Sequence, residues 1–155
     1  MHSPILAPVV ALVAWTLVMM LWMYATRLPA LGKASIDLAT WRGGTGAQLE
    51  EMLDPSIQWK AHNYNHLMEQ PTLFYAICLS LALMEFGGGL NLALAWAYVA
   101  LRIVHSIVQA TWNLVRVRFA IFSLASLMLA ALTDHAGLAL LQDKRPRRSG
   151  RASAP

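Results

Sequence analysis

The chain has 155 residues, of which 57% are hydrophobic and only 13% are charged. About a quarter of the residues in an ordinary soluble domain are charged, so this composition points to a membrane protein. The formal net charge of +4 does not indicate nucleic-acid binding, because the basic residues lie mostly in connections and in the C-terminal tail. The sequence also has no glycine-rich phosphate loop and no basic patch interleaved with aromatic residues, so no nucleic-acid partner is expected.

Residues 5–26 predict the first transmembrane helix. From Ser3 to Thr26 there is no Asp, Glu, Lys, Arg or His, and a bilayer core needs about 20 apolar residues. The stretch lacks the basic N-terminal region and the small-residue cleavage site of a signal peptide, so we expect it to be retained. Pro29 is expected to end this helix.

Three further apolar stretches predict the remaining spans at residues 66–86, 90–112 and 119–141. Three consecutive glycines, residues 87–89, separate the second stretch from the third, so these two helices should form an antiparallel hairpin. The expected fold class is therefore all-α: an integral membrane four-helix bundle within residues 1–143, with both termini on one side.

Two segments outside the spans also carry expectations. The long connection, residues 27–65, should contain one helical turn at residues 48–53, which Asp54 and Pro55 stop. Residues 144–155 form a basic flexible tail that is expected to face anionic lipid headgroups. The short basic tail and the absence of a eukaryotic retention signal favour a bacterial inner (plasma) membrane. The basic residues of the tail are Lys144, Arg145, Arg147, Arg148 and Arg151.

Polar residues recur inside the second and third predicted spans, where ionisable groups are costly and usually mark functional sites. On the third span they lie at offsets of three, four, seven and eleven from the first, which places them on one helical face. On the second span, spacings of four and three put His62, His66 and Glu69 on one face. The third-span residues are Arg102, His105, Ser106, Gln109 and Asn113.

Because the predicted hairpin makes these two helices neighbours, their polar faces can meet inside the bundle. Arg27, Arg116 and Arg118 are expected at the same end, which gives a basic mouth suited to a small anionic ligand held by arginine forks. An apolar co-substrate could enter from the lipid. The alternative is a purely structural ion pair between Glu69 and Arg102.

Two motifs in the chain resemble those of a known family, the membrane-associated proteins in eicosanoid and glutathione metabolism (MAPEG). The chain resembles a bacterial-type member of that family. The first is the run at residues 60–71, which contains Glu69 and Pro71. If the glutamate of the family motif is aligned with Glu69, the glutathione-contacting Asn of the family corresponds to His66 and its Arg corresponds to His62. In a second frame, Lys60-Ala61-His62 matches the Arg-Ala-His of the family, and Asn65 is its displaced Asn. Both frames remain open.

The second motif lies on the third span, where Arg102-Ile103-Val104-His105 resembles the Arg-x-x-His or Arg-x-x-Tyr of the family. Gln109 stands where the family commonly has Tyr. Arg118 falls where several members carry the arginine that stabilises the glutathione thiolate, and Arg116 fits the shorter spacing of other members.

The resemblance implies a homotrimer that binds glutathione as a co-substrate between adjacent subunits and acts on a lipophilic small molecule. The expected activity is that of a membrane glutathione S-transferase or a peroxidase-like enzyme. Arg118 or Arg116 would stabilise the thiolate, Glu69 would bind the γ-glutamyl amino group, and His105 would bind a carboxylate or a backbone polar group. Arg27 could hold another carboxylate, although an ordinary headgroup anchor is the favoured interpretation.

Two other hypotheses stay open. The replacements at His66 and Gln109 favour a non-catalytic relative, either a binding protein or an accessory membrane subunit. A less favoured alternative is a metal site, because His62, His66 and Glu69 form an H-x3-H-x2-E pattern that His105 could complete. The spacing matches no zinc signature closely, so no metal ligand is assigned.

Overall fold

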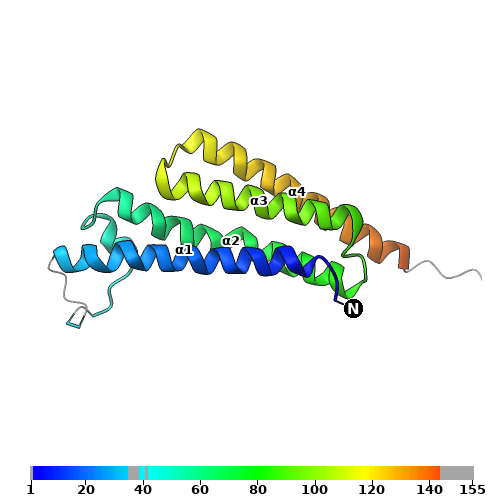
Figure 1. The fold of residues 1–155 in the computed structure, drawn as a ribbon, viewed down its shortest axis with the longest axis horizontal. Helices are drawn as coiled ribbons and strands as arrows, with labels where there is room; N and C mark the ends of the chain where they lie inside the picture. Colours follow the sequence, from blue (N-terminus) through cyan, green and yellow to red (C-terminus); the bar gives the residue numbers. More distant parts are fainter. Residues whose placement is uncertain (1, 35–38, 41, 144–155) are drawn as a thin grey trace, which may run out of the picture.

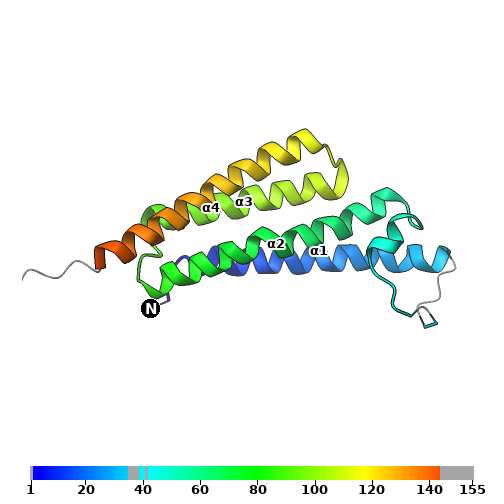
Figure 2. The same cartoon turned by 180° about the vertical axis from the view of Figure 1, so that it is seen from behind.

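The computed structural model describes residues 2–34, 39–40 and 42–143. Within these ranges it has four long α-helices and one short 3-10 helix, and the order along the chain is α1 (Leu6–Lys33), η1 (Ala47–Glu50), α2 (Pro55–Leu83), α3 (Gly89–Thr111) and α4 (Val115–Asp143). The helix α1 packs mainly on α2, and α3 packs mainly on α4 (Figure 1). Figure 2 shows the same two pairs from behind. The predicted basic tail, residues 144–155, lies outside the described residues.

The all-α membrane bundle predicted from the sequence is confirmed. Three helices, α1, α3 and α4, are long and apolar enough to cross a membrane. The helix α2 has the same length as α4, 29 residues, but its first half is rich in polar side chains. It lies along α1 and also contacts α3 and α4, so it is an integral part of the bundle. The described residues 42–54 and the turn 112–114 lie at one end, and the start of α1 and the end of α4 lie at the other (Figures 1 and 2).

The first helix does not end at Pro29, so that prediction was wrong. The helix α1 continues through the proline to Lys33. Tertiary contacts hold its last turns, because Leu31 packs with Leu49 and Leu53 in a small second apolar cluster. Proline is tolerated inside membrane helices where neighbouring groups compensate for the lost backbone hydrogen bond.

The helix α2 begins well before the apolar stretch that predicted it. Asp54 caps its N-terminus by accepting a hydrogen bond from the Ser56 backbone N–H at 2.8 Å, and Pro55 occupies the first helical position. The hydrogen bonds from Ser56 lower the pKa of the Asp54 carboxyl below its ordinary value. The long connection is thereby shortened to residues 34–54, and its expected helical turn is present as η1.

The apolar core lies mainly in the half of the bundle that contains the termini. Phe74 of α2 stacks on Tyr98 of α3, with ring centroids 4.4 Å apart and planes 15° apart. The predicted hairpin joins α2 to α3, and Gly87 within it packs against the N-terminal segment. A Cβ atom at Gly87 would lie 2.0 Å from the Ser3 Oγ and 2.8 Å from the Ile5 Cγ2, so only glycine fits. Other fully buried core residues are Leu12, Met19, Leu81 and Leu132.

Candidate functional site

The second half of α3 presents a polar face that is almost completely buried. Arg102 and Ser106 are 0% exposed, and His105 and Gln109 are scarcely more accessible. The spacing of these four residues in the sequence predicted that they share one face of the helix. A guanidinium buried in a membrane helix is costly, by about 3 kcal/mol on insertion scales, so its surroundings show how that cost is offset.

Arg102 is held by α2 through its neighbour His66. The Arg102 Nη2 donates to the His66 backbone carbonyl at 2.8 Å and to the His66 Nδ1 at 3.1 Å. Its Nε and Nη1 have no hydrogen-bond acceptor among the described residues. The alternative Glu69–Arg102 ion pair is absent, because Glu69 lies on the exposed face of α2 whereas the His66 carbonyl faces α3.

The two imidazoles form a stacked pair between α2 and α3. The ring centroids of His66 and His105 are 4.9 Å apart, with an interplanar angle of 19°. Phe122 of α4 packs against this pair, with its centroid 5.3 Å from that of His66. The Arg102 guanidinium carbon lies 5.9 Å from the centroid of the Phe122 ring, within the range of a cation–π contact. Three helices therefore converge on the imidazole pair.

A cavity of about 200 Å³ opens beside the stacked histidines. Arg118 is its one lining arginine, and the Arg118 Nη1 donates to the Asn113 Oδ1. No carboxylate lines this cavity, while the Arg102 guanidinium lies behind its histidine wall. Two positive charges near an apolar wall favour an anionic ligand with an apolar part. The lining residues are His66, His105, Val115, Arg118, Phe119 and Phe122.

A second cavity, of about 270 Å³, lies next to the first at the end of the bundle. Asn113, which accepts the Arg118 hydrogen bond, lines this second cavity, so that bond separates the two. His62 and Glu50 also line it and form an exposed side-chain contact with an Nε2–Oε1 distance of 2.9 Å. His62 thus lies at the mouth, apart from the stacked histidines.

Several buried polar atoms in this region lack hydrogen-bond partners. The Asn63 Nδ2 donates to the Ser106 Oγ at 2.6 Å, but the Asn63 Oδ1 is unpaired. The His105 Nδ1, the Gln109 Oε1 and the Arg118 Nε are also unpaired within the described part of the chain. Each unpaired buried polar group costs about 1–3 kcal/mol, so this concentration is typical of a binding region rather than of a purely structural core.

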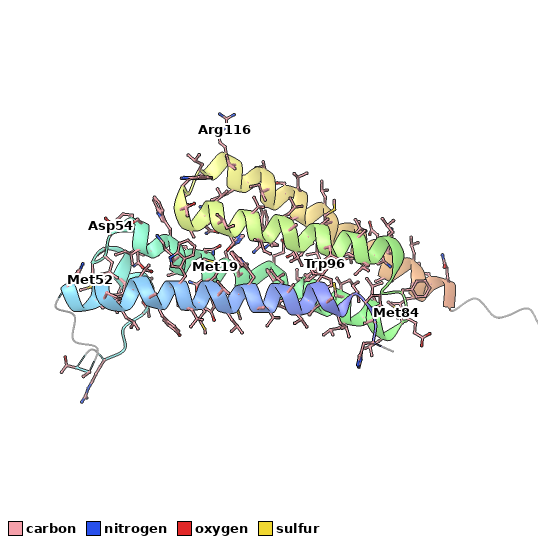
Figure 3. All side chains as sticks on the ribbon, viewed as in Figure 1. Met19, Met52, Asp54, Met84, Trp96 and Arg116 are labelled. Atoms are coloured by element: carbon pink, nitrogen blue, oxygen red, sulfur yellow. The ribbon has the colours of Figure 1, made fainter. Side chains whose placement is uncertain are left out.

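The other predicted site residues lie around this cluster. The Arg27 Nη2 donates to the Gly46 carbonyl and to the Gln58 Oε1, both at 3.1 Å, and so holds the long connection to α1 and α2. Asn65 and Glu69 are exposed on α2. Arg116 is exposed and points away from the bundle (Figure 3).

The metal-site alternative finds no support in the described ranges. No group of three His, Cys, Asp or Glu side chains is placed there to hold a metal ion. His62 is paired with Glu50, while His66 is bonded to Arg102. Their partners lie in different directions, so the two histidines do not converge.

The sequence analysis did not assign Asn63, or the cavity-lining residues Val115, Phe119 and Phe122, to the site. It placed Asn113 on the polar face of the third span without a role at the site, and the bond from Arg118 to Asn113 depends on the tight turn between α3 and α4. Asn63 precedes His66 by three residues and Phe122 follows Arg118 by four, so helical spacing was the signal that could have found them.

Comparison with known proteins agrees with this architecture. No curated protein and no solved structure was found to match the chain. The family model of the MAPEG family matches residues 5–138, which covers nearly all of the described bundle. The polar cluster on α2, α3 and α4 lies wholly within the matched range, and the chain belongs to the MAPEG family.

Proposed function

We propose that this protein is a membrane-bound glutathione-dependent transferase that acts on a lipophilic electrophile by thiolate activation. The observation that carries the proposal is the cavity beside the His66–His105 pair, which has Arg118 in its wall and Arg102 behind it. No carboxylate lines this cavity to neutralise the two arginines. Membership of the MAPEG family supports a role in glutathione or eicosanoid metabolism.

The unpaired atoms fit a small peptide ligand that carries carboxylates. The Arg118 Nε is a free donor and the His105 Nδ1 is unpaired, and both residues line the cavity. The cavity of about 200 Å³ is smaller than the roughly 300–1,000 Å³ typical of ligand pockets, so it would hold only part of a tripeptide. The remainder would extend along the neighbouring cavity and the mouth residue His62.

A second subunit would complete the site. Asn65 and Glu69 lie on the exposed face of α2, where they are available to a ligand held between two chains. We therefore propose a homotrimer, as in the family, in which Glu69 binds the γ-glutamyl amino group. Native mass spectrometry of the detergent-solubilised protein tests this assembly, and a monomer alone would contradict it. A bacterial inner membrane is part of the same proposal.

In this proposal Arg118 is the catalytic residue. The chemistry that glutathione supplies when bound is a nucleophilic sulfur, which is only a few per cent ionised near pH 7 because a free thiol has a pKa of about 8.5. The Arg118 guanidinium would favour the thiolate by charge and hydrogen bonding. Asn113 orients that guanidinium, and Arg102 positions His66 beside the cavity.

The lipophilic co-substrate would approach along α4. Val115, Phe119 and Phe122 form the apolar part of the cavity, and Phe119 is 70% exposed on the outer surface of the bundle. This arrangement offers an entrance from the lipid. The Arg118 side chain would then lie near an electrophilic carbon for transferase chemistry, or near a hydroperoxide oxygen for peroxidase-like chemistry.

The decisive experiment measures the ultraviolet absorbance of a thiolate when glutathione is added to the purified protein. An opposite charge lowers an acidic pKa by about 1–3 units, so Arg118→Leu should reduce the thiolate signal by about tenfold or more. Arg116→Leu is the matched control, because Arg116 is exposed and points away from the bundle. It should retain the signal.

A non-catalytic binding protein is the second candidate, favoured by His66, whose Nδ1 and backbone carbonyl are both occupied by Arg102. Thermal stabilisation by glutathione without a thiolate signal would support this candidate. The absence of both effects would exclude the transferase.

A further inference from the structure

A hydrogen-bonded junction of three helices lies one helical turn deeper in the bundle than the stacked histidines. The Gln70 Nε2 of α2 donates to the Ser126 Oγ of α4 at 2.8 Å. The Tyr98 hydroxyl of α3 donates to the Gln70 Oε1 at 3.3 Å. One amide side chain therefore joins all three helices. None of the three residues lines the cavity beside the histidines.

The junction is in register with the site on every helix. Each of its residues lies four positions along its helix from a residue of the site, and residues four apart in an α-helix share a face, one turn apart. The same three helices therefore meet twice, at the imidazole pair and again at the junction. The matched pairs are His66 with Gln70 on α2, Arg102 with Tyr98 on α3, and Phe122 with Ser126 on α4.

The hydrogen-bond directions require an amide at position 70. The Ser126 hydroxyl donates to the Phe122 carbonyl at 2.9 Å, so its oxygen is left to accept from Gln70. The Tyr98 side chain is fully buried, and its hydroxyl needs an acceptor there. A glutamine amide supplies both an N–H donor and a carbonyl acceptor, which neither an ionised carboxylate nor an apolar side chain does.

The bond from Gln70 to Ser126 spans the two helices that face each other across the cavity. His66 lines the cavity from α2, and Arg118 lines it from α4. Within the described part of the chain this is the only side-chain hydrogen bond between α2 and α4. The helix α4 packs mainly on α3, and the α3–α4 pair diverges from the α1–α2 pair toward the turn 112–114 (Figures 1 and 2). Apolar packing therefore constrains the separation of α2 and α4 less than that of α3 and α4.

We propose that Gln70 is a positioning residue, which through Ser126 holds α4 against α2 and so sets the distance of Arg118 from the stacked histidines. Arg118, Phe122 and Ser126 follow at intervals of four residues along one face of α4. The Asn113 bond fixes this helix at the turn, and the Gln70–Ser126 bond fixes it two turns deeper. The effect on a bound thiol rests on the proposed function, whereas the position of α4 does not.

The first experiment follows the thiolate absorbance of glutathione bound to the full-length protein in detergent as a function of pH. A guanidinium held less closely to the sulfur loses part of the roughly 1–3 pH units by which an opposite charge lowers an acidic pKa. Ser126→Ala should therefore raise the pKa of the bound thiol by about 0.5–1 pH unit. Ser126→Thr keeps the hydroxyl and should restore the wild-type value. Ser123→Ala is the matched control, because the Ser123 Oγ donates to the Phe119 carbonyl within its own helix.

A double-mutant cycle assigns the effect to the bond itself. Gln70→Met should raise the pKa of the bound thiol in the same direction as Ser126→Ala. The double variant should add little to either single variant, because each of them already breaks the bond. Two increases that add in full would show that the side chains act independently, and would overturn the proposal.

Hydrogen exchange of the protein without glutathione tests the position of α4 directly. We expect the amides of residues 115–126 to exchange at least about threefold faster in Ser126→Ala than in wild type or Ser126→Thr, because local opening becomes easier when α4 is released from α2. If wild type gives no thiolate signal, the proposed function fails and this measurement alone decides the inference. Unchanged exchange over residues 115–126 would overturn the positioning role. So would a wild-type thiolate pKa that Ser126→Ala leaves unaltered while it lowers stability.

Discussion

The two ends of the bundle are built from different interactions. At the end that carries the connections 34–54 and 112–114, buried polar side chains meet between α2, α3 and α4, and several of their atoms lack partners. At the end that carries the termini, apolar side chains dominate. The principal polar contact described there is the hydrogen bond of 2.7 Å that joins His135 to Asn91, whose Nδ2 in turn donates to the Phe86 carbonyl.

This difference separates stability from function within one helical scaffold. Apolar packing stabilises without leaving unpaired groups, whereas each unpaired buried polar atom is unfavourable. A concentration of such atoms around one cavity is expected where a ligand supplies the missing partners. The comparison therefore predicts that substitutions at the apolar end change stability, and that substitutions at the polar end change ligand binding more than stability.

The largest effect on stability is expected from Phe74→Ala in the apolar half. Phe74 is 0% exposed and stacks on Tyr98, so its removal should lower the free energy of unfolding by about 3–5 kcal/mol. Reversible unfolding in mixed micelles measures this change. Leu73→Ala is the control, because Leu73 is 63% exposed and should change stability far less. Equal losses in the two variants would contradict the assignment of the core.

Arg102→Met, at the polar end, should weaken ligand binding more than it changes the free energy of unfolding. Arg102 donates to His66 and does not line the cavity, so its loss should weaken glutathione binding indirectly, by about tenfold, through the lost positive charge and the released His66 side chain. The free energy of unfolding should change by less than about 1 kcal/mol, because replacement of a buried charge by a hydrophobe of similar volume is often neutral or stabilising. Isothermal titration and unfolding on the same sample separate these effects. A strongly destabilised variant that binds normally would reverse the assigned role.

A smaller effect is expected at the hydrogen bond between Asn63 and Ser106. Hydrogen bonds between membrane helices contribute about 0.6 kcal/mol on average and about 1.7 kcal/mol at most. A double-mutant cycle with Asn63→Ala and Ser106→Ala should give a coupling energy in this range. Ser123→Ala is a suitable control for hydroxyl removal, because the Ser123 Oγ bonds only to its own helix. No coupling would indicate that the two side chains act independently.

The smallest effect is expected at the N-terminus of α2, where hydrogen bonds from Ser56 lower the pKa of Asp54. A carboxyl group with a lowered folded-state pKa stabilises above its unfolded pKa, and the stabilisation is lost as pH falls through the folded pKa. Asp54→Asn keeps a capping side chain that does not titrate, so it should remove this pH dependence below about pH 4. Thermal unfolding followed by circular dichroism between pH 3 and 7 measures it. An identical pH profile in both proteins would contradict the assignment.

The sequence alone determined the membrane bundle and much of the polar face on α3. Long apolar stretches need a bilayer, and the glycines at 87–89 require a break that turns α2 back into α3. The buried face of α3 followed from the spacing of Arg102, His105, Ser106 and Gln109, because the opposite face of that helix is apolar apart from Thr111 at its end and has no competing polar pattern.

On α2 the tertiary structure decided which polar residues lie inside. Polar side chains surround the first half of that helix, so helical spacing allowed His62, His66 and Glu69 to face inward together. Packing of Leu67, Phe74 and Cys78 against the other helices turned a neighbouring face inward instead. Asn63 was buried by this rotation and Glu69 was left exposed, which is why Arg102 binds the His66 carbonyl and not a carboxylate. Periodicity defines a face, but only the contacts between helices select which face is buried.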